Sequence, residues 1–335
     1  MQRFIIDTDT AGDDVTSLLI GLRWPGVSIE GITVCAGNVE LEMCVRNALF
    51  TAEMADRPEV PVFVGAGKPL DRDLVTAHYV HGGDGMGDSD FPAPTKQPEG
   101  VEAADAIVQI AGRHPGEIEI IAQAPLTNIA LALERDPDLP RKVKRLWIMG
   151  GANNFVGNIT PAAEFNFFVD PLAAKRVMAA GFEVTLVPWD VCVHDGVLLA
   201  DELQPVVAMK SRLGEFYLAV NRAVRRFMKE EFGIDGISHP DALMMAMAID
   251  RTVILESDPC YVDVEADSVL ARGYSLVDKM HVVTREVDRG VRVNELMLVA
   301  SGAPNAEVVI RADKRRFSEM LFGVLSGQID PPAPS

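Results

Sequence analysis

The feature of this sequence that most restricts its fold is a regular alternation between short apolar runs and amphipathic helical patterns. Between the first two runs, Val15, Leu18 and Leu22 recur at the spacing of a helix that buries one face. This order predicts right-handed βαβ crossovers and a mostly parallel, Rossmann-like open sheet flanked by helices on both faces. The runs have the length and composition of buried strands and cover residues 4–7, 29–35, 60–64, 118–122, 146–149 and 184–187.

The rest of the chain has a different organisation. Residues 198–250 read as mainly helical, and after them come strand-like runs at 262–264, 274–277 and 291–299 and a final helix near 314–325. Residues 71–98 are rich in Gly, Pro, Asp and His, which predicts a long loop of the kind that often serves function. We expect one domain over residues 1–330 and a disordered tail over 331–335.

Composition excludes several classes of partner. The net charge of −18 argues against nucleic acid, because binding to phosphates relies on clustered Lys and Arg. No apolar run is long enough to span a bilayer, so we expect no membrane association. Cys35, Cys44, Cys192 and Cys260 lack paired CxxC spacing, which predicts reduced, mostly buried thiols and a cytoplasmic protein.

Acidic residues are concentrated directly after the first predicted strand. Asp7, Asp9, Asp13 and Asp14 fall within eight residues, and Gly12 allows a tight turn into the following helix. In an open α/β sheet, ligands bind outside the carboxyl ends of the strands. Four neighbouring carboxylates would repel one another unless a hard cation were shared among them. The segment therefore predicts a divalent-metal site.

Other interpretations of this segment account for only part of it. A helix N-cap explains Asp13 or Asp14 but neither Asp7 nor Asp9. An EF-hand loop starting at Asp7 would place Leu18 where the bidentate Glu belongs, so we exclude it. A solvated acidic loop stays open as an interpretation. So does a magnesium-dependent phosphatase of the haloacid-dehalogenase type, with Asp7 as nucleophile and Asp9 as general acid, although it leaves the doubled Asp13-Asp14 unexplained.

Residues 5–14 resemble the signature of the inosine–uridine preferring nucleoside hydrolases. The order and spacing of the matching blocks extend over nearly the first 250 residues, which makes the resemblance specific. It implies the nucleoside hydrolase fold, calcium-dependent cleavage of ribonucleosides to ribose and free base, and a homo-oligomer, commonly a dimer or tetramer. The further blocks are residues 33–38, 46–48, 81–82, 84–85, 124–130, 149–151, 157–158, 163–166, 169–171 and 240–242.

The resemblance also implies roles for individual residues. Asp9 matches the general base that deprotonates the attacking water and also contacts the calcium ion. Asp14 and Asp241 match its other carboxylate ligands, and Gln123 matches a residue that ligates through its backbone carbonyl. The residues that match the sugar-binding side are Asp13, Asn158, Glu164 and Asn166, with Met149 beside the sugar and Asn38 as a polar support near the metal.

The chemistry of the reaction calls for these residue types. Cleavage of a nucleoside passes through an oxocarbenium-like ribosyl cation, which nearby carboxylates stabilise. Calcium accepts six to eight oxygen ligands, so it can bind the 2′ and 3′ hydroxyls together with the water that it acidifies. A site that holds both hydroxyls favours ribose over deoxyribose, because losing one hydroxyl leaves buried polar groups unpaired.

The sequence departs from the family pattern at the residue before the late metal-binding aspartate. Known members carry a histidine there that helps to protonate the leaving base, whereas this chain has Pro240, with His239 one position earlier. Proline has no proton to give. His81 is therefore our first candidate to interact with the base and His239 the second, with an aromatic stack from Phe227 or Tyr217 as a third. The choice between purine and pyrimidine stays open.

Two rival functions remain at this point. The phosphatase would release phosphate with magnesium and no free base from nucleosides. A non-catalytic nucleoside-binding protein would bind without turnover, and the altered Pro240 position is the one feature that favours it.

Overall fold

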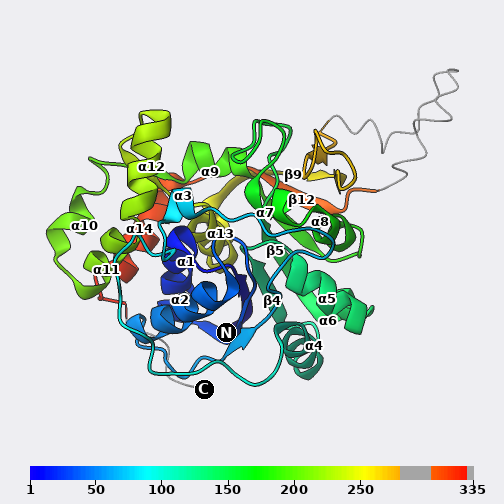
Figure 1. Cartoon of the computed structure of the whole chain (residues 1–335), viewed down its shortest axis with the longest axis horizontal. Coiled ribbons are helices and arrows are strands. Elements are labelled where there is room, and N and C mark those ends of the chain that lie inside the picture. The colour runs from blue at the N-terminus through cyan, green and yellow to red at the C-terminus, as the bar shows by residue number, and fades with distance from the viewer. Residues whose placement is uncertain (280–302, 330–335) are drawn as a thin grey trace, which may run out of the picture.

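The computed structural model describes residues 1–279 and 303–329, which form an open sheet with helices on both faces (Figure 1). The described strands of this sheet follow the order β3-β2-β1-β4-β5-β6-β12-β9. The first six pair in parallel, as predicted from the apolar runs. They are β1 (Gln2–Thr8), β2 (Val27–Val34), β3 (Val62–Val64), β4 (Ile118–Ala122), β5 (Val143–Met149) and β6 (Val184–Val187).

Strand β1 lies at the point where the strand order reverses, since β2 flanks it on one side and β4 on the other. The loops after β1, β2 and β4 therefore diverge around a crevice at the carboxyl edge of the sheet, where open α/β sheets bind ligands. The acidic segment that follows β1 is thus placed at the ligand-binding edge.

The sheet divides the apolar core into two layers, one on each of its faces. Phe4 and Ile6 belong to one apolar cluster, whereas Ile5 belongs to the other, because successive side chains point to opposite faces. The first layer is covered by α1 (Gly12–Arg23), α2 (Leu41–Met54), α13 (Pro240–Ile249) and α14 (Lys314–Leu325). The second is covered mainly by α4 (Ala103–Arg113), α5 (Thr127–Arg135) and α8 (Pro171–Met178).

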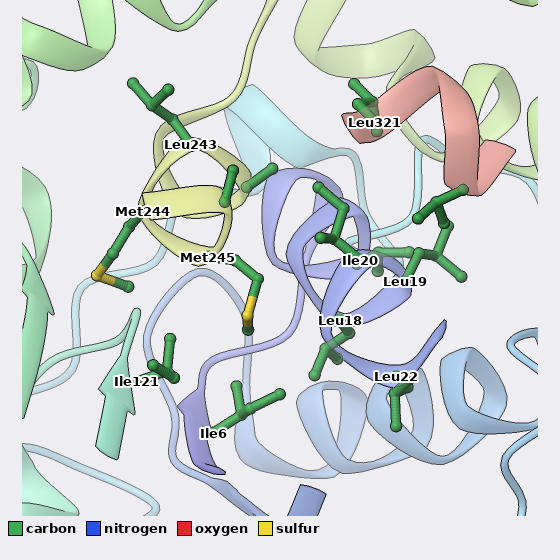
Figure 2. Close-up of a cluster of buried hydrophobic side chains, with 14 of the residues drawn as sticks. Ile6, Leu18, Leu19, Ile20, Leu22, Ile121, Leu243, Met244, Met245 and Leu321 are labelled. Carbon is green, nitrogen blue, oxygen red and sulfur yellow. The ribbon is translucent and has the colours of Figure 1, made fainter. Parts of the chain in front are cut away.

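Helix α13 is buried on nearly all sides, which explains why its sequence is apolar around its whole circumference. Figure 2 shows Met245 of this helix between Ile6 of β1 and the side chains of α1. Gly21 of α1 permits the close approach, since a Cβ there would lie 3.0 Å from Cε of Met245. This packing fixes the start of α13, which carries Asp241.

The chain after β6 combines predicted and unpredicted elements. The predicted final helix is α14, and the predicted runs at 262–264 and 274–277 correspond to β10 (Val262–Val264) and β11 (Ser275–Val277). The helical stretch contains α9 (Trp189–Asp195), α10 (Gln204–Met209), α11 (Arg212–Val220) and α12 (Arg222–Phe232), with a small sheet of β7 (Val197–Leu199) and β8 (Gly236–Ser238). Short helices complete the described list: α3 (His78–His81), α6 (Leu139–Lys142), α7 (Phe165–Val169) and η1 (Arg251–Val253).

Two strands of the main sheet were not predicted from the sequence. These are β9 (Ile254–Cys260) and β12 (Ala306–Ala312), of which β12 pairs in parallel with β6 and antiparallel with β9. Strand β9 is an edge strand whose side chains are mostly exposed, so it carries no apolar pattern. The predicted strand at 291–299 and the predicted tail at 331–335 lie outside the described residues.

Two further predictions concern the cysteines and the membrane. All four thiols are buried and unpaired, as expected from their spacing. Over residues 1–279 and 303–329, each helix is too short or too polar to cross a bilayer.

The packing of α13 predicts that Met245→Ala lowers the free energy of unfolding by about 2–5 kcal/mol, because a fully buried side chain leaves a cavity. Chemical denaturation followed by circular dichroism measures the change. Met43→Ala is the matched control, since Met43 of α2 is exposed and should cost much less. Equal losses in the two variants would contradict this description of the core.

Candidate functional site

A cavity opens at the carboxyl edge of the sheet, where open α/β sheets bind small molecules. Loops that follow β1, β2, β4 and β5 meet the start of α13 around it. Asp9 and Asp14 lie just outside the cavity lining. Each accepts a hydrogen bond from Asn38, which is part of that lining. Nine of the predicted site residues line the cavity: Asp13, Asn38, His81, Gln123, Met149, Asn158, Glu164, Asn166 and Asp241.

An acidic centre forms the floor of the site. Carboxylate oxygens of Asp13, Asp14 and Asp241 lie within 4.8 Å of one another, although Asp241 is more than 220 positions from the other two along the chain. Asp9 adds a fourth carboxylate beside them: its Oδ2 accepts a hydrogen bond from the backbone N–H of Asn38 at 2.7 Å, and its Oδ1 is buried without a hydrogen-bond partner among the described residues.

Asp14 is held by four hydrogen bonds. Its Oδ1 accepts from Oγ1 of Thr8 at 2.7 Å and from Nε2 of Gln123 at 3.0 Å. Its Oδ2 accepts from the backbone N–H of Ala11 at 3.1 Å and from Nδ2 of Asn38 at 3.0 Å. The side chain of Gln123 thus orients the Asp14 carboxylate. The sequence had pointed only to the backbone carbonyl of Gln123, so this role was not predicted.

The loop after β2 approaches the acidic centre so closely that only glycine fits. A Cβ at Gly37 would overlap Oδ2 of Asp9 and lie 2.8 Å from its Cγ. This contact brings the backbone N–H of Asn38 within hydrogen-bonding distance of Asp9. Gly37 therefore allows the two strand ends to share the site.

Burial makes this cluster of acids unfavourable in its charged form. It raises the pKa of Asp13 and of Asp14 to about 6, and the repulsion between neighbouring carboxylates adds to the effect at Asp14. Burial also raises the pKa of Asp9 and of Asp241 well above the usual range, with repulsion from Asp14 and Asp13 respectively adding to it. Among the described residues no Lys or Arg pairs with any of the four. Oxygen donors without a protein counter-charge fit a hard divalent cation.

A preorganised polar wall stands beside the acidic centre. Glu164 caps the first turn of α7 and accepts hydrogen bonds from the backbone N–H groups of Asn166 at 2.8 Å and Gly151 at 2.9 Å. Burial raises its pKa to about 7. Nδ2 of Asn166 donates to the backbone carbonyl of Met149 at 3.1 Å, and Oδ1 of Asn158 accepts from the N–H that begins α7, at 2.8 Å. These side chains are fixed before a ligand arrives.

A second part of the cavity lining is apolar and is called the apolar wall below. Helix α12 contributes Val224, Phe227, Met228 and Phe232, while Tyr79 comes from α3. The rings form a connected cluster, since Phe227 makes edge contacts of 5.7 Å with both Tyr79 and Phe232. A wall of this kind suits a flat, partly apolar ring. Phe227 was foreseen in this role, whereas Tyr79 and Phe232 carry no sequence pattern that singles them out.

His81 is part of the cavity lining and lies close to the apolar wall, since a Cβ at Gly12 would lie 3.0 Å from both Nδ1 of His81 and Cγ2 of Val224. Its Nδ1 is buried without a hydrogen-bond partner among the described residues and lies 3.9 Å from Oδ1 of Asp13. Burial lowers its pKa to about 4, so the ring is neutral in the free protein at neutral pH. The structure thus places the first candidate for base activation in the cavity, next to the acidic centre.

The predicted contact of His239 with the base is wrong, and so is the predicted stack from Tyr217. His239 is fully buried and is not part of the cavity lining. Its Nδ1 lies 3.0 Å from the carbonyl oxygen of Gly196, and its Nε2 lies 2.7 Å from the hydroxyl of Tyr217, which is also fully buried. Because both ring nitrogens are bound inside the fold, His239 has none left for a ligand.

Comparisons with known proteins agree with this geometry. The model of the "Inosine-uridine preferring nucleoside hydrolase" family matches residues 4–319. A pyrimidine-specific ribonucleoside hydrolase, RihA of Klebsiella pneumoniae (strain 342), is 30% identical over 324 residues, which cover 95% of this chain and 96% of that protein.

Solved structures show the same fold. A plant nucleoside hydrolase superposes with a TM-score of 0.88 at 29% identity, covering 99% of both chains. A purine-preferring ribonucleoside hydrolase from Gardnerella vaginalis superposes with a TM-score of 0.85 at 26% identity, covering 97% of this chain and 98% of the other. These matches favour neither the phosphatase nor the non-catalytic alternative. The chain belongs to the inosine–uridine preferring nucleoside hydrolase family and is a hydrolase that acts on the N-glycosidic bond of ribonucleosides.

Proposed function

We propose that this enzyme hydrolyses ribonucleosides in a calcium-dependent reaction in which Asp9 activates the attacking water, releasing ribose and the free base. The observation that carries the proposal is the division of one cavity into three parts. An acidic centre around Asp14 and Asp241, a polar wall fixed by Glu164 and an apolar wall on α12 meet in this cavity. The three parts correspond to the metal, the ribose and the base.

The proposed ligands of calcium are Asp9, Asp14, Asp241 and the backbone carbonyl of Gln123. All donors are oxygens, and the buried Oδ1 of Asp9 has no other partner among the described residues, which fits a hard cation. A bound calcium ion would supply positive charge and coordination positions for water and for the vicinal hydroxyls of ribose.

The proton of the attacking water is assigned to Asp9. Its Oδ1 has no hydrogen-bond partner among the described residues and is assigned to the metal, which leaves a lone pair of Oδ2, beside the hydrogen bond from the N–H of Asn38, for the proton. As the bond between C1′ and the base nitrogen breaks, positive charge develops on the ribosyl ring. Asp13, Asn158, Glu164 and Asn166 are the proposed contacts of the sugar; Asn38 is proposed to support the metal ligands, and Met149 to lie beside the ring.

The leaving base is proposed to receive its proton from His81, whose neutral ring would take up a proton from the acidic centre as it gives up its own. This residue lies at the border between the acidic centre and the apolar wall, and its Nδ1 has no partner among the described residues. A proton transferred to the departing ring neutralises the charge that it would otherwise carry away.

We further propose that residues 1–330 form one domain and that the protein is a cytoplasmic homo-oligomer, dimer or tetramer. The shared sheet under both core layers supports the single domain. The four unpaired, buried thiols agree with a reducing compartment.

An assay with a panel of ribonucleosides and calcium tests the proposal. We expect equal amounts of reducing sugar and free base. Because the relatives include a pyrimidine-specific and a purine-preferring enzyme, the panel includes both kinds of base. Release of phosphate from phosphomonoesters with magnesium, without free base, would instead support the phosphatase, and tight binding without turnover would support a binding protein.

Asp9→Asn is expected to lower turnover by about 10²–10⁴-fold, because an amide cannot accept the proton of water. Circular dichroism should show an unchanged fold. The matched control is Asp267→Asn, on an exposed side chain outside the cavity, which should keep full activity. Activity retained in Asp9→Asn would remove this residue from the role of base.

His81→Ala is expected to lower turnover by about 100-fold or more on nucleosides with poor leaving bases, which need a proton. On a nitrophenyl riboside, whose leaving group needs none, the loss should be much smaller. The ratio of the two kcat values is the measurement. Equal losses on both substrates would argue against a proton donor at position 81.

Gly37→Ala is expected to displace Asp9 and lower turnover by about 100-fold, since an error of about 1 Å in a reacting group can cost that much. Gly67→Ala is the control, because a Cβ there would have its nearest neighbour at 3.6 Å. Full activity in a folded Gly37→Ala variant would show that the close approach is not needed.

A further inference from the structure

Three distances define the surroundings of His239. Its backbone N–H and its Nδ1 both lie 3.0 Å from the carbonyl oxygen of Gly196, and its Nε2 lies 2.7 Å from the hydroxyl oxygen of Tyr217. A carbonyl oxygen can only accept, so Nδ1 carries the proton and Nε2 accepts from the Tyr217 hydroxyl. This arrangement fixes both the tautomer and the orientation of the ring.

The ring of His239 is also enclosed by two aromatic rings. Tyr217 of α11 lies parallel to it, with 5.8 Å between ring centroids and 9° between planes, and Phe317 of α14 lies 5.7 Å away at a steeper angle. Since Tyr217, His239 and Phe317 are all fully buried, this cluster has no room for alternative rotamers.

His239 is the residue from which α13 begins. It is the N-cap of the helix, and its carbonyl oxygen accepts the hydrogen bond from the N–H of Leu243 at 3.0 Å. Pro240 follows with a fixed φ, and Asp241 is next in the first turn. The direction in which the Asp241 carboxylate leaves the backbone is therefore set by how His239 is anchored.

Asp241 depends on this anchor more than the other acids of the centre do. Asp14 accepts four hydrogen bonds and Asp9 accepts one from the loop after β2. In the described part of the chain no N–H group donates to the Asp241 carboxylate; its neighbours there are other carboxylates. Its position consequently rests on the backbone of α13.

We infer that Tyr217 and His239 form a positioning pair that sets the Asp241 carboxylate for metal binding. The inference rests on the proposed calcium site. The pair also connects the start of α13 with the apolar wall, because Tyr217 belongs to α11 and α11 leads directly into α12, which carries that wall. In this chain the histidine two positions before Asp241 thus supports the proposed metal ligand through the backbone rather than contacting the base.

Isothermal titration of calcium into the metal-free protein tests the inference, at a temperature well below unfolding. Tyr217→Phe keeps the ring and removes the hydroxyl, and we expect it to weaken calcium binding by about 10–100-fold, as is typical for residues that orient a metal ligand. Turnover at saturating calcium should change far less. The control is Tyr274→Phe, which loses a hydrogen bond of 3.0 Å to Oδ1 of Asn154 outside the acidic centre and should bind calcium normally.

His239→Asn provides a second test, because its amide can still donate to Gly196 while the bond to Tyr217 is lost. The double variant should bind calcium about as weakly as either single one, since all three lack the same bond. Unchanged calcium affinity in the folded single variants, even with a lower melting temperature, would overturn the inference and leave the calcium site intact. If the unsubstituted protein bound no calcium, the proposed metal site would fail and the inference with it.

Discussion

The buried carboxylates at the end of β1 are the constraint around which the rest of the site is arranged. Asp9, Asp14 and Asp241 are almost wholly removed from solvent, and each has a pKa raised by burial. No basic side chain among the described residues compensates them. Such a group of acids is unfavourable unless it is protonated or shares a cation, and this conflict links the fold to its proposed chemistry.

The fold holds these acids close together because separate segments of the chain anchor them. The turn from β1 into α1 and the side chain of Gln123 hold Asp14, while the glycine turn after β2 brings Asn38 to Asp9. Helix α13, packed on all sides, brings in Asp241 from a distant part of the sequence. The polar wall capped by Glu164 and the apolar wall of α12 line the remaining space, which we propose holds the sugar and the base.

Much of the fold and of the site could be predicted because the signals are local. Buried parallel strands are short apolar runs, and the residues proposed to bind the metal and the sugar lie in compact blocks with a recognisable order. What was missed depends on contacts between distant segments. Strand β9 lies at an edge with exposed side chains, and His239 turns into the core because Tyr217 and Gly196 bind both of its ring nitrogens. The sequence around His239 contains no pattern that would predict its contacts with Tyr217 and Gly196.

A crystal structure of the protein grown with calcium and ribose tests the central claim most directly. We expect one calcium ion that takes oxygen ligands from Asp9, Asp14 and Asp241 and also contacts two hydroxyls of the sugar. Electron density with these carboxylates turned apart and no shared ion, or with ribose bound away from them, would contradict it.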